Sequence, residues 1–181
     1  MKMFKKIMAV ALVGVMALSM LTGCAVTDAV AEKQAEKALE NACKTVTGET
    51  VNFKSLSVES SVTTPVKNDI KNGVIKVEDG KAYATTVKSG EKAYTVVVVT
   101  EPKSATKIEN WKNVAFNALT AAIAEGTAKK TEGIHIEGTT NKTAKVDVTV
   151  DLEGKDATDS TKKDTYAMFV FAANKAAYDK K

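Results

Sequence analysis

Ala93-Tyr94-Thr95-Val96-Val97-Val98-Val99-Thr100 is the stretch that decides the fold. Its four consecutive valines place apolar, β-branched side chains on both faces of an extended chain. A strand that is apolar on both faces is typical of a central position in a sheet, with neighbours on both sides. The stretch therefore predicts a β-sheet in which residues 93–100 form an interior strand.

Turn signals and alternating patterns predict further strands around this one. Asp79-Gly80 and Ser89-Gly90 are strong hairpin turns, and they suggest a β-meander through residues 74–100. Valines alternate with charged and polar residues over 146–152, which is typical of a half-buried strand. A change of parity near Ser55 suggests a bulge. The predicted strands are 51–62, 74–78, 83–88, 93–100, 134–138, 146–152 and 166–172.

Two helices are predicted from apolar residues at three- and four-residue spacing. The first covers 28–45 and includes Cys43 in its apolar stripe, so we expect a buried structural thiol. The second covers 106–126, with Thr106 and Glu109 as a capping box, Trp111 as a core anchor and Gly126 as the stop. The tail 174–181 is polar and is compatible with a short helix.

The order of these elements predicts an α+β fold, an antiparallel sheet packed by two helices. A helix followed by strands occurs at 28–100 and again at 107–172, and this order suggests two α-β-β-β repeats that share one sheet. We expect one domain over residues 28–181, a length sufficient for one hydrophobic core.

The N-terminus has the composition of an export signal. Lysines dominate residues 1–6, residues 7–21 are almost entirely apolar, and Leu21-Thr22-Gly23-Cys24 follows. A helix over 7–21 reaches only about 22 Å, less than the ~30 Å hydrocarbon core of a bilayer. A signal-peptide core therefore explains the run better than a permanent transmembrane helix.

Leu21-Thr22-Gly23-Cys24 resembles the lipobox of bacterial lipoproteins. The resemblance implies cleavage after Gly23, lipidation of Cys24, a signal peptide at 1–23, and a lipidated N-terminus with a short tether at 24–27. It also implies attachment to the cell membrane or outer membrane, with the domain on the extracytoplasmic side. The alternative is an ordinary secretory signal with an incidental cysteine. No family resemblance is found for residues 26–181.

Composition narrows the possible partners. Loss of Lys2, Lys5 and Lys6 with the signal peptide reduces the formal net charge from +4 to +1, so nucleic acid is not an expected partner. All basic side chains are lysines, so a site for anions would use ammonium groups, helix N-termini or backbone amides. If Cys24 is lipidated, Cys43 has no cysteine with which to form an internal disulfide.

No motif in the sequence specifies catalysis, a cofactor or a metal. His135 is the only histidine, and we expect it at the surface or a sheet edge, so a zinc site is improbable. Ser104-x-x-Lys107 and Lys88-Ser89-Gly90 resemble motifs of penicillin-binding enzymes, but their order is reversed. The acidic residues in 147–159 are interrupted by Lys155, which favours a solvated loop over a calcium site.

These observations favour a lipid-anchored extracytoplasmic binding or envelope-associated protein without catalytic activity. Its partner would be a protein, a peptide or a cell-wall component, in addition to the membrane itself. The alternative is an extracytoplasmic hydrolase or transferase with a lysine and carboxylate site assembled only in the folded chain. A third possibility is a spacer or assembly factor without a small ligand.

Overall fold

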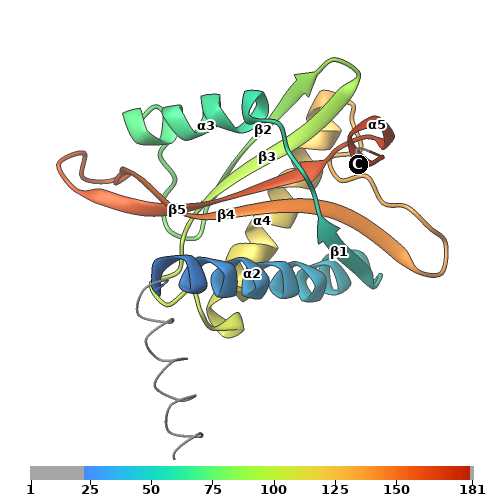
Figure 1. Ribbon diagram of the computed structural model, residues 1–181, viewed down its shortest axis with the longest axis horizontal. Helices are drawn as coiled ribbons and strands as arrows, with labels where there is room; N and C mark the ends of the chain where they lie inside the picture. Colours follow the sequence, from blue (N-terminus) through green and yellow to red (C-terminus); the bar gives the residue numbers. More distant parts are fainter. Residues whose placement is uncertain (1–22, 180–181) are drawn as a thin grey trace, which may run out of the picture.

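The computed structural model describes residues 23–179, with side chains from residue 27. Its centre is a five-stranded sheet in the order β1-β4-β5-β3-β2 (Figure 1). All neighbouring strands are antiparallel except β1 and β4, which are parallel. The predicted α+β class is therefore confirmed. The strands are β1 Val51–Ser55, β2 Ala82–Ser89, β3 Lys92–Thr100, β4 Lys142–Lys155 and β5 Lys163–Ala172.

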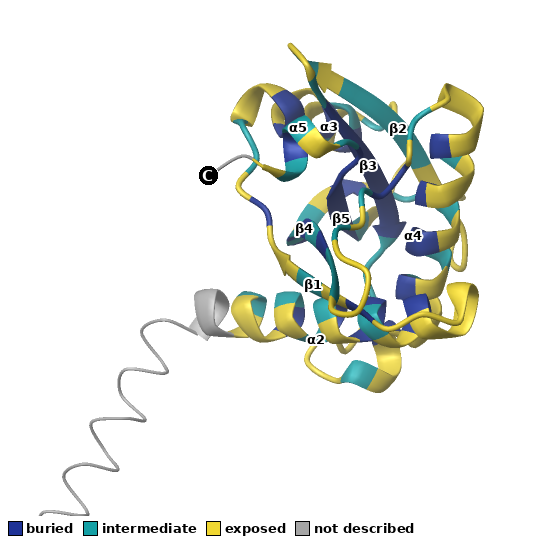
Figure 2. Ribbon diagram, turned by 90° about the vertical axis from the view of Figure 1, so that its right-hand side faces the viewer, coloured by how far each residue is buried: buried dark blue, intermediate teal, exposed yellow. Residues whose placement is uncertain are grey.

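Strand β3 contains the valine run and lies between β5 and β2, as predicted. Val97 and Val99 face one core, while Val96 and Val98 face a second core on the other side of the sheet. Helices cover both faces, and this arrangement explains why the strand is apolar throughout (Figure 2). The buried residues of the two cores all lie between Ala31 and Ala177, so residues 24–181 contain both cores.

Helices α2, Gly23–Thr47, and α4, Ile108–Lys129, cover the first face. They pack closely because small side chains line their contact. The buried stripe of α2 is the one expected from its spacing, except that Val46 near the end of the helix is exposed. The expected tether, residues 24–27, belongs to the first turns of α2. Cys43 and Trp111 are both buried in this core, as predicted. Trp111 packs edge-on against Phe169, with 6.2 Å between the ring centroids.

The second face carries a helix that the sequence analysis missed. Residues 60–72, part of which was expected as a strand, form α3, Ser60–Asn72. Val62, Val66 and Ile70 occur four residues apart and are buried against the sheet. The neighbouring serines and threonines and Pro65 are weak helix formers, so the composition of the segment did not indicate a helix. The short helix α5, Lys175–Tyr178, lies on the same face and contributes Ala177 to the core.

Two segments predicted as strands run beside the sheet without forming ladders. In 74–78, Ile75 and Val77 are buried, but the N–H groups of Val74 and Ile75 both donate to the Asp69 carbonyl at the end of α3. In 134–138, only the isolated bridge between Glu137 and Thr143 resembles strand pairing. The predicted meander therefore starts at β2, and the element order does not divide into two α-β-β-β repeats.

The ends of α4 also differ from expectation. Its N-cap is Lys107 and no side chain caps it, so the predicted capping box of Thr106 and Glu109 is wrong. Gly126 lies within the helix, which continues to Lys129. A Cβ atom on Gly126 would lie 2.4 Å from the Cα atom of Gly133. This glycine is therefore needed for the close approach of the following segment, and it does not stop the helix.

Candidate functional site

A groove lies between α3 and the hairpin formed by β4 and β5. Its volume is about 680 Å³. Its charged lining consists of five lysines and two carboxylates, so positive charge predominates. The groove residues are Lys67, Asn68, Lys71, Asp151, Leu152, Glu153, Gly154, Lys155, Ser160, Thr161, Lys162 and Lys163.

The local sequence explains how these lysines converge. Lys67 and Lys71 are four residues apart on α3, and each directly follows a buried residue of that helix, Val66 or Ile70. Gly154 allows α3 to lie close to the hairpin, because a Cβ atom there would lie 2.8 Å from the Ile70 Cγ2 atom. Two chain segments far apart in sequence thus form the two walls of the groove.

The ion pairs in the groove leave part of its positive charge available. Lys163 Nζ lies 2.8 Å from Glu153 Oε2, and this contact lowers the pKa of Glu153 and raises the pKa of Lys163. Both groups therefore stay charged near neutral pH. Lys71 and Lys155 are exposed on opposite walls, and neither forms an ion pair shorter than 4 Å with a described residue.

The groove lies at the same end of the domain as the start of α2. The Asp151 N–H in the groove lining donates to Glu101 Oε2 at 2.7 Å. Burial raises the pKa of Glu101, and the nearby carboxylates of Asp151 and Asp28 raise it further despite that hydrogen bond. Asp28 lies four residues after Cys24 on α2, which is about one helical turn. Figure 1 shows the start of α2 and the β4–β5 hairpin at the same side of the molecule.

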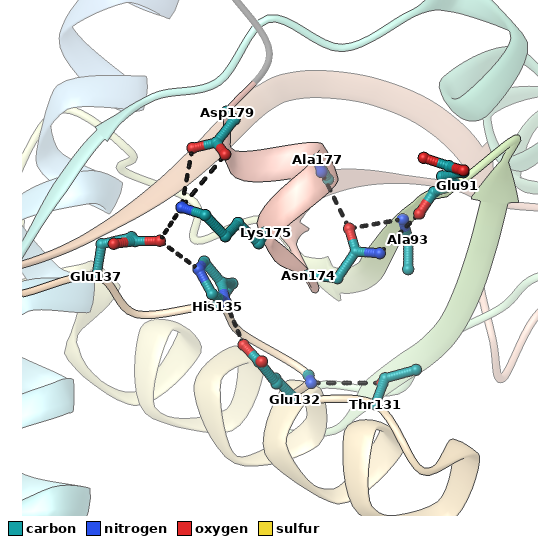
Figure 3. A network of polar contacts seen from close by, with 11 residues as sticks. Glu91, Ala93, Thr131, Glu132, His135, Glu137, Asn174, Lys175, Ala177 and Asp179 are labelled. Atoms are coloured by element: carbon teal, nitrogen blue, oxygen red, sulfur yellow. Dashed lines mark hydrogen bonds and ion pairs between the residues drawn. The ribbon is translucent and has the colours of Figure 1, made fainter.

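His135 lies at the centre of a separate polar network (Figure 3). Its Nδ1 contacts Glu132, and its Nε2 lies 3.0 Å from Glu137 Oε1. Lys175 Nζ contacts the same Glu137 oxygen at 2.8 Å and Asp179 at 3.3 Å. The His135 side chain is only 11% exposed, so it is more buried than the sequence analysis expected.

This network joins the segment after α4 to α5, and its groups are paired with one another. Both ring nitrogens of His135 face carboxylates, which leaves neither nitrogen available to accept a proton from a substrate. The network is therefore better suited to holding the fold together than to catalysis. Sequence reasoning missed it because Lys175 is 38 residues from Glu137, so no local pattern links them.

The other sequence candidates do not assemble into a site. Lys88-Ser89-Gly90 lies at the hairpin before β3, whereas Ser104 and Lys107 follow the other end of that nine-residue strand. Asp156 and Asp159 accept hydrogen bonds from Thr158 and Thr161, which organises the polar turn. Among the side chains that the structure describes, residues 27–179, no group of three or more metal-binding side chains is close enough to hold an ion.

The predicted cleavage site Gly23 and lipidation site Cys24 lie in the first turn of α2, where the side chains are not described. The rest of the predicted signal peptide 1–23, residues 1–22, lies outside the described residues. No helix in the described part of the chain is both long and apolar enough to cross a membrane. Comparisons with protein-family models, curated proteins and solved structures found no match.

Proposed function

We propose that this chain is a lipid-anchored extracytoplasmic protein that binds a phosphate-bearing envelope component without catalysing a reaction. The observation that carries the proposal is the groove with five lysines at the end of the domain where α2 begins, in the turn that contains the lipobox-like Cys24. Lysine binds phosphate as a point charge, and a chain without arginine has only lysine side chains for this purpose.

A lipid anchor on Cys24 and the lysine groove would both contribute to binding at a membrane surface. Acyl chains on Cys24 would contribute about 0.8 kcal/mol for each buried methylene group, so two or three chains would hold the protein at the membrane. The groove would then lie near the lipid headgroups. Lysines near an anionic surface each contribute about 1 kcal/mol to binding at moderate ionic strength. Phosphate groups of lipid headgroups or of an envelope polymer are therefore the ligands that the groove suits.

The charge states in the groove favour binding over catalysis. A lysine base requires a lowered pKa, and a carboxylic acid donor requires a raised one. The pKa of Lys163 is instead raised and the pKa of Glu153 is lowered, which is the opposite of what catalysis requires. The alternative function, a hydrolase or transferase with a lysine and carboxylate site, would need a different pair of groups in this groove.

The groove is tested with residues 24–181 carrying Cys24→Ser. One arm uses vesicles of phosphatidylcholine with phosphatidylglycerol, and a second arm uses soluble inorganic polyphosphate. We expect Lys71→Gln/Lys155→Gln to weaken binding by about 10- to 30-fold, because two lysines are lost. The matched control is Lys37→Gln/Lys129→Gln, which removes the same charge from α2 and α4.

The control variant should bind nearly as well as the parent protein, and high salt should weaken binding of both. An equal loss in the two variants would show that net charge alone drives binding and would refute the groove. Binding in only one arm identifies the phosphate source as lipid or polymer. The anchor has its own test: labelled palmitate should enter the full chain but not Cys24→Ser.

A further inference from the structure

The two edge strands of the sheet, β1 and β2, differ in how far they are shielded from pairing with another strand. Strand β1 is only five residues long, and the Phe53 N–H on it donates to Glu40 Oε1 of α2 at 3.4 Å. Strand β2 is eight residues long, with neither proline nor a register shift against β3. Long regular edge strands readily pair with another strand unless a protein covers or interrupts them.

The backbone groups that β2 leaves exposed follow from its hairpin. Ser89 pairs with Lys92 across the two-residue turn, so Ser89, Val87, Thr85 and Tyr83 direct their N–H and carbonyl groups toward β3. The alternate residues direct theirs outward: Ala82, Ala84, Thr86 and Lys88. Within residues 23–179, no further backbone hydrogen bond to these four residues is present.

Strand β2 is complementary to a second copy of itself. An antiparallel pair with its two-fold axis at Thr85 places Tyr83 opposite Val87 and Ala84 opposite Thr86. Lys88 then lies opposite Ala82, so no two like charges are opposed. Tyr83 is 40% exposed in the single chain and would gain an aliphatic partner, an aromatic and β-branched pair of the kind that stabilises sheets.

We propose that two copies of this chain associate through antiparallel pairing of their β2 strands, which forms one continuous sheet. The four outward-facing residues of each copy would exchange about eight backbone hydrogen bonds. The Thr85 residues of the two copies would lie opposite each other in a non-hydrogen-bonded pair, with about 4.5 Å between their Cα atoms. This inference uses none of the groove residues, so it stands or fails independently of the proposed function.

The position of Thr85 on the axis provides the test. In residues 24–181 with Cys24→Ser, Thr85→Cys should form a disulfide-linked dimer under mild oxidation, because its Cα separation lies within the range for disulfides. Lys88→Cys is the matched control on the same strand, and its two copies would lie about 20 Å apart. The parent protein, which keeps the buried Cys43, should not cross-link.

Sedimentation at increasing concentration gives the second measurement. The parent protein and Thr85→Val should dimerise, whereas Thr85→Lys should raise the dissociation constant at least about tenfold, because it opposes two positive charges at the axis. Circular dichroism confirms that Thr85→Lys is folded. Equal cross-linking at positions 85 and 88, or a parent protein that stays monomeric at about 200 µM, would overturn the proposal. Pairing of β2 only with an extended peptide of another protein would also overturn it.

Discussion

Two buried polar atoms on β3 have no hydrogen-bond partner within the described residues, Thr95 Oγ1 and Tyr94 Oη. Thr95 is fully buried, so its hydroxyl has lost water without gaining a partner. On the same strand, Thr100 Oγ1 donates to the Val77 carbonyl at 3.0 Å. One strand thus contains an unsatisfied threonine and a satisfied one, which permits a matched comparison.

We expect Thr95→Val to raise the free energy of unfolding by about 1 kcal/mol, because valine has nearly the same shape without the unsatisfied hydroxyl. The same change at Thr100 should lower the free energy of unfolding by about 1 kcal/mol, because it leaves the Val77 carbonyl without its donor. Urea unfolding monitored by the fluorescence of Trp111 measures both. A lower free energy of unfolding in Thr95→Val would contradict the conclusion that the Thr95 hydroxyl is buried without a hydrogen-bond partner.

At the scale of elements, close approaches between backbones position the helices. α3 lies against β4 where Gly154 has no side chain, and α4 lies against the following segment where Gly126 meets Gly133. Neither Gly154 nor Gly126 has a positive φ angle, so steric space and not backbone conformation accounts for the glycine. Apolar periodicity can show that a helix is buried, but it does not show how close the helix must lie to its neighbour.

Gly154→Ala should lower the free energy of unfolding by about 1–3 kcal/mol, because the added methyl group would overlap both Ile70 and Tyr166. Since Ile70 is on α3, the helix should move away from the hairpin and weaken phosphate binding in the groove. Thermal unfolding measures the first effect and vesicle binding the second. An unchanged melting temperature would show that the helix and hairpin are not in close contact.

Gly126→Ala should be destabilising to a similar degree, although alanine is the better helix former. Helix propensity alone predicts a gain of about 1 kcal/mol, whereas overlap with Gly133 predicts a larger loss. Ala128 is an exposed position near the end of the same helix, and Ala128→Gly there should cost up to about 1 kcal/mol. A Gly126→Ala protein that melts higher than the parent would refute the close contact.

For the whole molecule, the His135 network makes stability depend on pH. Burial alone would lower the pKa of His135, but hydrogen bonds to Glu137 and Glu132 and their charges outweigh this effect and raise the pKa. The hydrogen bonds from Lys175 and His135 lower the pKa of Glu137. The stabilisation from charged His135 is therefore complete below a pH of about 6.5 and is lost as the pH rises through the raised pKa.

A second group of carboxyls changes stability in the same direction. Burial raises the pKa of Glu32, Glu36 and Asp147, and nearby carboxylates raise the pKa of the two glutamates further. Protonation of these groups favours the folded state, so their contribution is present at acidic pH and is lost as the pH rises through their pKa values. His135→Gln leaves these carboxyls in place, so comparing that variant with the parent protein separates their effect from that of the network.

We expect the melting temperature to fall by about 2–4 °C between pH 6 and pH 9 because the His135 network loses its positive charge. His135→Gln should remove most of this dependence while keeping a polar side chain. Since His135 is the only histidine, one imidazole resonance in an NMR titration reports its pKa directly. A pKa at or below 6.5, or an unchanged pH profile in His135→Gln, would contradict this account.

The sequence by itself determined the elements whose signals are local. The valine run predicted an interior strand, and β3 is one. Spacing predicted most of the buried faces of α2 and α4, including Cys43 and Trp111, although Val46 and Ile123 are exposed. These predictions hold because side-chain periodicity and the faces of a helix or strand arise within one stretch of chain. The lipobox resemblance is equally local and remains a prediction about Cys24.

Only the tertiary structure decided which apolar segments pair in the sheet. Residues 74–78 and 134–138 have strand-like patterns, but neither forms a ladder. Residues 74–78 bond to the end of α3, and residues 134–138 make only single contacts with β4 and β5. The lysine groove and the His135 network were likewise invisible, because each joins residues far apart in the chain. The physical reason is that a backbone hydrogen bond or an ion pair needs a partner, and the fold, not the local sequence, supplies that partner.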